Sequence, residues 1–502
     1  MSRVIKRIGI SNFKSFANYT PIDLGDITIL SGLNSSGKSS IYQIFFLLAQ
    51  SFDNYLYGND VDEISKVPTL NLNGEIIKLG LGLELLNDQN KNSFQVNFEW
   101  EDGAKAGFSF GIMKRKKYEK KISFVIDASH FETKEGLGYS AKREGYNWKI
   151  EANAILRFTN PAVPQKATEH IEQNLRSSCR EDLIREDKHY WKQEVHFSEI
   201  NSVGFQNFYL ERFSVPLDQI VNCLKDEYIS YIEAERLGNE ISNIIGRNDV
   251  FFLANEIFSF CSKHILGPDN ITYLPPFRGF PKRVYSYSDS NKIDAVKFNA
   301  NDDVDYYFDN KENSTKTGTL KDAVNFWIVD HFNFAEEVII NEPIPDLASE
   351  IFLRRGEKLI PINNVGFGTS QIIPVIFEIL ANHNNKLFFI DEPEIHLHPS
   401  AQSKLADFFL NMALIGKRIF VETHSEYLID KFIYLNMLNN VPAPKINMLW
   451  AKLKDNQTIM EKIEYDEFGF IINAPNGFLS EKADLVEKLN QIRFAKMSDQ
   501  NA

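Results

Sequence analysis

Residues 32–40 read GLNSSGKSS. This stretch matches the pattern G-x-x-x-x-G-K-[ST], with Gly32, Gly37, Lys38 and Ser39 at the fixed positions. The apolar run DITIL precedes it, and the apolar run IYQIFFLLAQSF follows it. A strand, a glycine-rich turn and a helix in this order predict a phosphate-binding loop (P-loop) in an α/β protein.

The chemistry of the P-loop explains its residue types. Glycine lets successive backbone N–H groups converge on one anion, and the helix that follows points its positive end at the same place. Lys38 supplies an ammonium for the β- and γ-phosphates, and the Ser39 hydroxyl is a hard oxygen ligand for Mg²⁺. A chance glycine- and serine-rich loop is the alternative, which the flanking strand and helix argue against. The residues expected to contact the nucleotide here are Gly32, Asn34, Ser35, Ser36, Gly37, Lys38, Ser39 and Ser40.

The composition is that of an ordinary globular protein, with 43% hydrophobic and 25% charged residues over 502 positions. The net charge of −13 argues against a surface that binds nucleic acid everywhere, although it leaves a local basic patch open. Three cysteines without close spacing do not suit a disulfide framework or a zinc knuckle. The chain shows no signal peptide and no run of the ~18 apolar residues that a membrane helix needs. We therefore expect a soluble cytoplasmic protein.

The rhythm of apolar residues divides the chain into three parts. Residues 1–130 should form the N-terminal part of an α/β head, with short β-rich runs from 75 to 130 that predict a meander. Residues 131–270 carry apolar side chains at three- and four-residue spacings, which predicts a mainly helical insertion. Residues 271–502 return to alternating strands and helices, apart from polar stretches over 286–320 that we expect to be surface loops.

Residues 386–399 read KLFFIDEPEIHLHP, in which a buried strand ends in Asp391 and Glu392. In a P-loop enzyme a second strand lies beside the first and ends in an acid that steadies magnesium, a role that fits Asp391. Glu392 would lie further out, where it could accept a proton from a water that attacks the γ-phosphate. A solvated acid at a strand end is the alternative for Glu392, and the presence of the P-loop favours catalysis.

Two further stretches indicate what kind of P-loop protein this is. KRIFVETHS, residues 417–425, is another buried strand with His424 at its end, where a neutral imidazole could donate to the γ-phosphate; a structural histidine is the alternative. In NNVGFGTSQIIPVIFEIL, Gly366 and Gly368 precede a helix that we expect to start near Ser370, giving a second helix N-terminus able to bind an anion. Two such helix starts with only one lysine loop predict that two subunits share each nucleotide.

These elements, in this order, resemble the ABC-type ATPase head of structural-maintenance-of-chromosomes (SMC) proteins, Rad-type repair ATPases and the OLD family. The resemblance is carried by RIGISNFKSFANYTPIDLGDITILSGLNSSGKSS, ITYLPPFRGFPKRVYSYS, GFGTSQ, FIDEPEIHLHP and FGFIINAPNGFL. It covers roughly half of the chain, at both ends. Within that group the chain looks like the stand-alone bacterial ATPases of AAA or OLD-like type that occur in phage-defence operons. The fold that this implies is a mixed or parallel sheet with a P-loop, an antiparallel β lobe and an inserted helical lobe.

The resemblance implies roles for the matching residues on one nucleotide. Glu392 would be the general base and His424 a switch histidine. The residues implied for phosphate are Gly37 and Lys38, and those implied for Mg²⁺ are Ser39 and Asp391.

The same resemblance implies contacts with a nucleotide on the partner subunit. Gly368, Thr369 and Ser370 would cap its γ-phosphate. The chain departs there from the family pattern L-S-G-G-Q, because it reads G-F-G-T-S-Q, and either hydroxyl could make the contact. For the glutamine loop and the adenine-stacking residue, the resemblance suggests only Lys14 and Phe16.

Residues 394–399 would form the dimer-contact loop after the catalytic acid. His396 and His398 in this loop could be misread as zinc ligands, but a zinc site needs about four ligands and no cysteine lies nearby. Most OLD proteins also carry a metal-dependent TOPRIM nuclease after the ATPase. The residues after His424 instead read as a strand pair and a terminal helix without the spaced acids of that chemistry, so we expect no nuclease in this chain.

The leading hypothesis is an ATPase that uses ATP and Mg²⁺, forms a head-to-tail dimer or higher oligomer, and acts as the sensor or regulator of a separately encoded effector. The resemblance suggests anti-phage defence, with a nuclease or toxin as effector and a phage component or DNA as trigger. The second hypothesis is a DNA-repair or DNA-structure-binding ATPase, supported by the basic run MKRKKYEKK at residues 113–121, for which a solvated hairpin is the alternative. A third is a scaffold that binds ATP without hydrolysing it.

Overall fold

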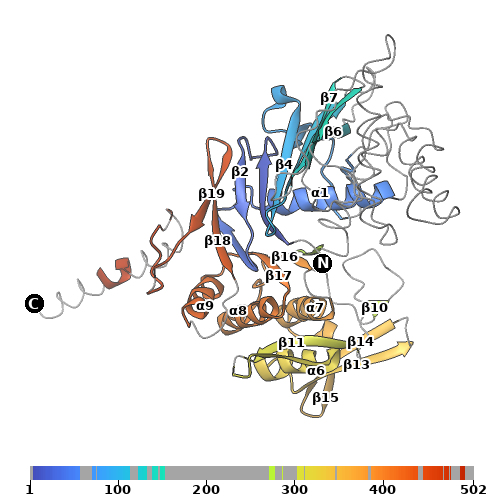
Figure 1. Ribbon diagram of the computed structural model, residues 1–502. Coiled ribbons are helices and arrows are strands. Elements are labelled where there is room, and N and C mark those ends of the chain that lie inside the picture. The colour runs from blue at the N-terminus through green and yellow to red at the C-terminus, as the bar shows by residue number, and fades with distance from the viewer. Residues whose placement is uncertain are drawn as a thin grey trace, which may run out of the picture.

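The computed structural model shows a mixed sheet and an antiparallel sheet that enclose one helix. Further helices cover the outer face of the mixed sheet (Figure 1). The helices expected between residues 165 and 265 lie outside the described residues. The structure describes residues 4–56, 70–74, 76–113, 123–132, 138–144, 147–152, 271–276, 285–286, 302–309, 311–344, 348–382, 386–438, 445–466, 468–473, 475 and 487–491.

A six-stranded sheet carries the P-loop. Its strands β18, β3, β17, β16 and β9 run parallel, and β19 pairs antiparallel with β18. The strands β3, β16 and β17 are buried along their whole length, so they appear in the sequence as unbroken apolar runs. The expected α/β fold with a mixed sheet is confirmed. In spatial order the strands are β19 (Gln457–Ile463), β18 (Ile446–Lys454), β3 (Ile27–Gly32), β17 (Arg418–Glu422), β16 (Leu387–Asp391) and β9 (Ile271–Leu274).

A seven-stranded antiparallel sheet forms the second layer, as the sequence predicted for the β lobe. The predicted domain boundary at residue 130 falls inside β6, and the sheet continues to Ala152. The first of the β-rich runs predicted from residue 75 onward, EIIKLGLGLEL at residues 75–85, is not a strand. Its described residues form no strand, because Gly80 and Gly82 adopt positive φ angles of 75° and 99°. The spatial order is β2 (Thr20–Asp23), β1 (Ile5–Ser11), β4 (Ser93–Trp100), β5 (Lys105–Met113), β6 (Ser123–Glu132), β7 (Gly138–Glu144) and β8 (Asn147–Ala152).

The helix α1 (Ser39–Leu56) follows the P-loop and lies between the two sheets. Its Phe45 ring lies 6.2 Å from Phe98 of the antiparallel sheet and 4.9 Å from Phe389 of the mixed sheet, measured between ring centroids. Because α1 is buried from both sides, the position of the P-loop at its start is fixed by both layers of the core.

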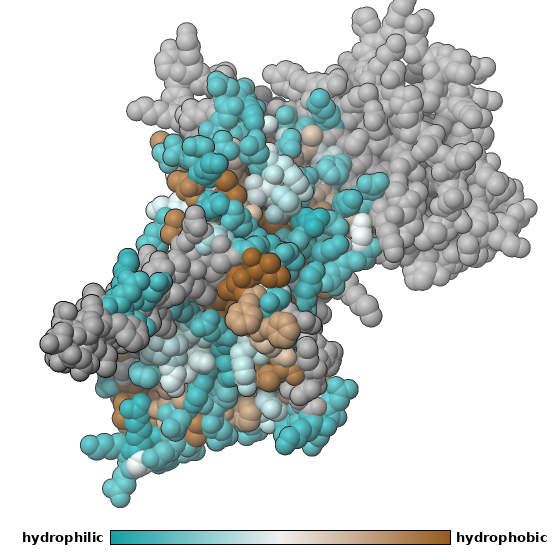
Figure 2. Space-filling model, turned by 90° about the vertical axis from the view of Figure 1, so that its left-hand side faces the viewer, coloured by the Kyte–Doolittle hydropathy of each residue, from teal (hydrophilic) through white to brown (hydrophobic). Residues whose placement is uncertain are grey.

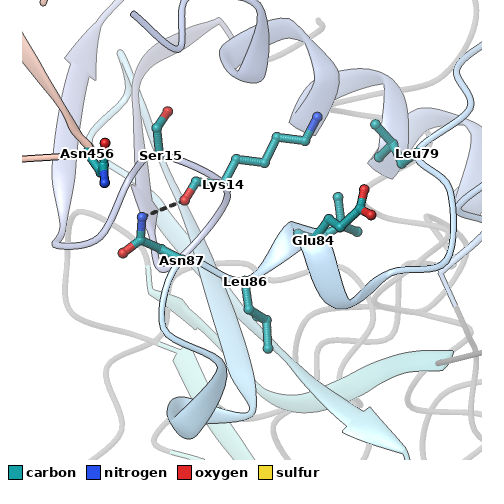
Figure 3. Close-up of a pocket in the computed structure, with 8 residues that line it drawn as sticks. Lys14, Ser15, Leu79, Glu84, Leu86, Asn87 and Asn456 are labelled. Carbon is teal, nitrogen blue, oxygen red and sulfur yellow. Dashed lines mark hydrogen bonds between the residues drawn. The ribbon is translucent and has the colours of Figure 1, made fainter. Parts of the chain in front are cut away.

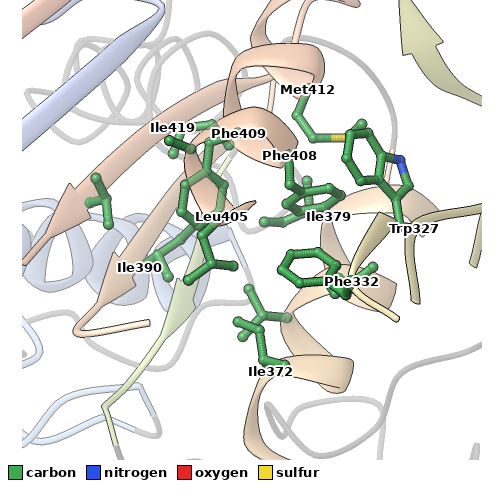
Figure 4. Packing of buried hydrophobic residues seen from close by; sticks show 14 of the residues in the cluster. Trp327, Phe332, Ile372, Ile379, Ile390, Leu405, Phe408, Phe409, Met412 and Ile419 are labelled. Carbon is green, nitrogen blue, oxygen red and sulfur yellow. The ribbon is translucent and has the colours of Figure 1, made fainter. Parts of the chain in front are cut away.

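Three helices cover the other face of the mixed sheet: α7 (Phe367–Ala381), α8 (Pro399–Leu414) and α9 (Glu426–Met437). Figure 4 shows Phe409 and Leu405 of α8 beside Ile390 of the sheet, and Trp327 beside Met412. This core holds the strand ends and the helix starts of the site in a fixed relation.

A smaller unit packs on these helices. The polar residues 286–320 were predicted to be loops, but residues 303–319 form a hairpin, because Tyr306 and Phe308 turn into the core of Trp327 and its neighbours. The frequent Asp, Asn and Lys residues hid this pattern. Its elements are β10 (Tyr285–Ser286), β11 (Asp303–Asp309), β12 (Ser314–Thr319), α6 (Leu320–Asn325), the π-helix η4 (Phe326–His331), β13 (Glu337–Ile344), β14 (Ala348–Arg355) and β15 (Lys358–Pro361). Short 3-10 helices among the described residues are η1 (Leu83–Leu85), η2 (Gln89–Lys91) and η5 (Ile362–Asn364).

The surface of the described residues is largely hydrophilic in the view of Figure 2, with one small apolar cluster near the centre of that face. No described helix is long and apolar enough to cross a membrane.

Candidate functional site at the carboxyl edge of the mixed sheet

The P-loop connects the end of β3 to the start of α1, as predicted. Gly37 has a φ of +89°, a conformation that other residues adopt at a cost. A Cβ atom on Gly37 would strike Thr458 Oγ1 and Ser15 Oγ. Thr458 Oγ1 lies 2.6 Å from Ser15 Oγ and donates to the Ser36 carbonyl at 2.8 Å. The loop is therefore enclosed by two segments from opposite ends of the sequence, which the motif alone could not reveal.

Lys38 is buried inside the loop, with 4% of its surface exposed. Its Nζ donates to the carbonyl oxygens of Gly32 and Leu33 at 3.2 and 2.9 Å, and lies 3.6 Å from Glu422 Oε1. The ammonium group thus stands at the carboxyl edge of the sheet, where the positive end of α1 also points.

The other predicted P-loop residues differ in exposure. Asn34 and Ser35 are exposed, Ser39 is half-buried, and Ser36 and Ser40 are buried. Ser36 Oγ has no hydrogen-bond partner among the described residues, although it is shielded from solvent. Buried hydroxyls normally find a partner, so this orphaned atom marks a place where a bound ligand would complete the loop.

The two predicted acids lie at the same edge, but the strand order differs from the expected one. β17 lies between β3 and β16, so Glu422 and not Asp391 ends the strand that neighbours β3. Asp391 and Glu422 are paired in register, and the backbone N–H of Glu392 donates to the Glu422 carbonyl at 2.8 Å. Glu392 has a φ of +43°, which is strained for a residue other than glycine. Sequence reasoning missed Glu422.

Glu422 is the most perturbed acid of this cluster. Burial and the nearby Asp391 raise the pKa of Glu422 to about 8, while Lys38 acts in the opposite direction. Its Oε2 atom is buried and has no hydrogen-bond partner among the described residues. Although Lys38 is 3.6 Å away, its charge does not offset the loss of solvent and the repulsion from Asp391, so the surroundings of Glu422 favour its protonated form. The carboxylate of Asp391 and the hydroxyl of Ser39, both hard oxygen donors, suit Mg²⁺.

His424 faces Glu392 across this edge, with Nε2 3.7 Å from Glu392 Oε1. Burial and the charge of Lys38 lower the pKa of His424, while Glu392 opposes them, so the imidazole is neutral at neutral pH. Glu394 holds the backbone here, because its Oε1 accepts from Thr423 Oγ1 and from the His424 N–H, both at 2.7 Å. The predicted base and the predicted switch histidine are therefore neighbours, and the missed residue Glu394 ties their two loops together.

The second glycine turn lies at the start of α7. This helix begins at Phe367 and not near Ser370, with Gly366 as its N-cap. Gly366 is exposed, and no described residue lies within 4 Å of the place where its Cβ would be. Of the two hydroxyls left open for the phosphate contact, that of Ser370 is enclosed: only 2% of Ser370 is exposed, and its Oγ donates to the Phe367 carbonyl at 2.7 Å. Thr369 is less buried and is the better placed hydroxyl.

The loop after Glu392 packs against this turn within the same chain. A Cβ on Gly368 would strike the carbonyl oxygen of His396, and the rings of Phe367 and His396 meet edge to face at 4.8 Å. His398 caps α8 by accepting from the Ser400 N–H at 3.3 Å. No group of three or more His, Cys, Asp or Glu side chains that could hold a metal ion occurs among the described residues.

A cavity of about 450 Å³ opens beside the P-loop (Figure 3). Lys14 crosses it, with Nζ 2.5 Å from Gln43 Oε1 of α1, and Asn87 Nδ2 donates to the Lys14 carbonyl at 2.7 Å. Phe16 is fully buried in the core, which is inconsistent with the suggestion that it stacks on adenine. The residues that line the cavity are Lys14, Ser15, Leu79, Glu84, Leu85, Leu86, Asn87 and Asn456.

In a comparison with known families, residues 280–429 match the model of an AAA ATPase domain. The chain is an ATPase. The matched segment of this ATPase contains the second glycine turn, Asp391, Glu392 and His424, whereas the P-loop lies outside it. The parallel pairing of β3 with β17 joins the P-loop to the matched part. No protein of curated function matches the ATPase by sequence.

Solved structures give loose likenesses only. An Smc head bound to the C-winged-helix domain of ScpA has a TM-score of 0.35 at 11% identity, over 93% of this ATPase and 99% of that chain. An Smc head with an extended coiled coil, bound to the C-terminal domain of ScpA from Pyrococcus furiosus, has 0.33 at 12% identity, over 97% and 99%. The SMC head from Thermotoga maritima has 0.33 at 8% identity, over 92% and 99%.

Proposed function

We propose that the chain is an ABC-type ATPase subunit that binds ATP and Mg²⁺ at its P-loop and hydrolyses ATP in a dimer with a second copy. One observation carries this proposal: Lys38, Asp391, Glu392 and His424 converge on one edge of one sheet, although they come from the ends of two strands and the start of a helix. Such a convergence is what phosphoryl transfer to water requires, because this reaction depends on positioning and on charge stabilisation.

Each residue then has a chemical task. The backbone N–H groups of the P-loop and the ammonium of Lys38 bind the phosphates. When ATP binds, Lys38 Nζ would leave the carbonyl oxygens of Gly32 and Leu33 and donate to phosphate oxygens instead. Ser39 and Asp391 hold Mg²⁺, which when bound neutralises charge on the phosphates. Glu392 accepts the proton of the attacking water, and the neutral imidazole of His424 donates to the γ-phosphate.

The cavity beside the P-loop is the proposed place for the adenine base. It adjoins the loop through Ser15, whose hydroxyl contacts Thr458. Lys14 and Asn87 offer polar groups to a base, and Leu79 and Leu86 offer apolar surface. A mixed apolar and polar lining of this kind is usual for small-molecule sites.

The turn at Gly366 supports the two-subunit part of the proposal. Gly366 itself is exposed and open at its Cβ position, and Thr369 is less buried than Ser370, although Gly368 and Phe367 pack on the loop of His396. We place it against the γ-phosphate held by the P-loop of the second copy. ATP binding would then close the dimer and hydrolysis would open it.

We further propose that this cycle serves a sensor or regulator of a separately encoded effector, such as a nuclease or toxin, in bacterial anti-phage defence. The support is the ATPase domain together with the family likeness of the sequence motifs. Co-expression with neighbouring genes under phage challenge tests this part, and protection that survives loss of ATPase activity would contradict it.

The test of the ATPase assignment is Glu392→Gln. This variant keeps the size of the side chain but cannot accept the proton, so hydrolysis should fall by about 10²–10⁴-fold while ATP binding persists. Phosphate release and nucleotide binding measured on the same preparation decide the outcome. Unchanged hydrolysis would remove Glu392 from the role of base.

A DNA-structure-binding ATPase is the second candidate. Residues 114–122 connect β5 to β6, whose last pair is Met113 with Ser123, so the basic run joins two adjacent antiparallel strands. Replacing Lys114, Arg115, Lys116 and Lys117 by glutamine would abolish salt-dependent DNA binding if this candidate is correct. Binding that stays absent in the wild type at low salt would exclude it.

A further inference from the structure

Two tyrosines from distant parts of the chain hold the same oxygen of Asp391. The Tyr42 hydroxyl, on α1, lies 3.1 Å from Asp391 Oδ2, and the Tyr273 hydroxyl, on β9, lies 3.3 Å from that atom. The two rings are stacked, with centroids 5.0 Å apart and planes at 26°. Tyr42 is one turn along α1 from Ser39, and Tyr273 is in register with Phe389, two residues before Asp391.

Both phenols act as donors. The Tyr42 and Tyr273 hydroxyls each donate a hydrogen bond to Asp391 Oδ2. Since both hydroxyls donate to Oδ2, they fix the rotation of the carboxylate and thereby the direction in which its Oδ1 atom points.

We propose that Tyr42 and Tyr273 are positioning residues for magnesium, which orient the Asp391 carboxylate toward an ion shared with Ser39. The proposal rests on the proposed function, because it concerns the same Mg–ATP site. Groups that hydrogen-bond a metal-ligating carboxylate raise metal affinity by holding the ligand in its binding orientation, and losing them typically costs 10–100-fold.

The arrangement also links the ion to the two layers of the site. Tyr42 moves with α1 and the P-loop, whereas Tyr273 belongs to the outermost strand of the mixed sheet. The two hydrogen bonds to Asp391 Oδ2 therefore fix the position of the carboxylate relative to both the P-loop and the mixed sheet. Ring packing alone would not require both hydroxyls to face one carboxylate oxygen.

The test compares Tyr42→Phe, Tyr273→Phe and the double variant with the wild type. Each change removes one hydroxyl and keeps the ring. The matched control is Tyr465→Phe, since Tyr465 is also partly buried and its hydroxyl accepts a hydrogen bond, from Asn436, but it belongs to the region after β19. Electron paramagnetic resonance of Mn²⁺ with a non-hydrolysable ATP analogue measures ion affinity, and fluorescence of a labelled nucleotide in EDTA measures metal-free binding.

The double variant should bind Mn²⁺–nucleotide at least tenfold more weakly, while metal-free nucleotide binding stays within twofold of the wild type. Excess Mg²⁺ should restore ATP turnover. Unchanged ion affinity in the double variant, or an equal loss in Tyr465→Phe, would overturn the proposal, as would an equal loss of metal-free binding. Because these readouts need no hydrolysis, a wild type that binds Mn²⁺–nucleotide but hydrolyses no ATP would contradict the proposed function and leave the tyrosine test decisive.

Discussion

The two glycine turns of this ATPase differ in what surrounds them. Gly37 of the P-loop is enclosed, with Thr458 and Ser15 at the place where a Cβ would be. Gly366, at the start of α7, is exposed and meets no described residue within 4 Å of its Cβ position. Both turns start a buried helix, yet the first is enclosed at Gly37 while the second is open at Gly366.

This contrast indicates a division of labour. The enclosed turn lies beside Lys38, Asp391 and Glu392, so one chain brings together the groups that we propose to bind and activate the nucleotide. The open turn lies on the loop of His396, and no described residue lies within 4 Å of the Gly366 Cβ position. The open turn is suited to complete a site on another copy, and the enclosed turn is suited to receive one.

The largest expected effect comes from adding a side chain at Gly37, in the enclosed turn. Gly37→Ala should weaken ATP binding on the order of 100-fold, because it combines a strained φ with a collision against Thr458 and Ser15. Gly356→Ala is the matched control, since Gly356 also has positive φ but no described residue within 4 Å of its Cβ position. Equal binding in the two variants would show that the P-loop does not depend on this enclosure.

A charge at the open turn should act on turnover and not on binding. Gly366→Glu should reduce hydrolysis about tenfold or more, because the carboxylate would face the phosphates of the second copy, where like charges repel. Gly366→Ala should behave as the wild type, since the position is open and its φ is −55°. Steady-state hydrolysis alongside nucleotide affinity checks this, and normal turnover in Gly366→Glu would break the comparison.

His424 should also make ATP turnover fall at acid pH. Because the pKa of His424 lies below its ordinary value, the imidazole stays neutral as pH falls and gains a positive charge only under acid conditions. There it would attract the Glu392 carboxylate 3.7 Å away and compete with the water that this base activates. Turnover should drop a few-fold there, and His424→Gln, a donor that does not titrate, should lack this drop. A pH profile of turnover at saturating ATP measures it, and an identical drop in His424→Gln would assign it to another group.

The smallest effect concerns stability. Glu422 has a pKa of about 8 in the folded protein and an ordinary one near 4.5 when unfolded, so the folded state holds the extra proton between these values. The free energy of unfolding should therefore fall as pH rises through this window, by on the order of 1 kcal/mol per pH unit. Glu422→Gln should flatten that slope, and Glu357→Gln, at an exposed position, should not. Equal slopes from urea titrations would contradict the assignment.

Much of the fold could be predicted from the sequence, for reasons that particular segments make clear. The strands β3, β16 and β17 are unbroken apolar runs, so both their existence and their parallel setting were predictable. The P-loop motif likewise identified Lys38, because its residue types follow from phosphate chemistry at a helix start. Hairpin β11–β12 was missed since its core residues are scattered among acids and amides.

The rest of the site depends on contacts between distant residues. Thr458 contacts Ser15, 443 positions away in the sequence, and Tyr42 contacts Asp391, 349 positions away. No local sequence pattern could predict either contact. Strand order decided that Glu422 and not Asp391 neighbours β3, and sequence periodicity does not specify strand order. Ser370 looked like a phosphate ligand until its helix was seen to begin three residues earlier.

The most direct test of the two-turn account mixes two inactive variants. In a dimer of one Glu392→Gln subunit and one Gly366→Glu subunit, one composite site keeps the intact P-loop, base and open turn, while the other site carries both changes. Turnover by the mixture, measured by phosphate release, should rise well above that of either variant alone. No gain in turnover, in a mixture shown to contain the mixed dimer, would contradict the claim that each ATP is completed by the open turn of a second copy.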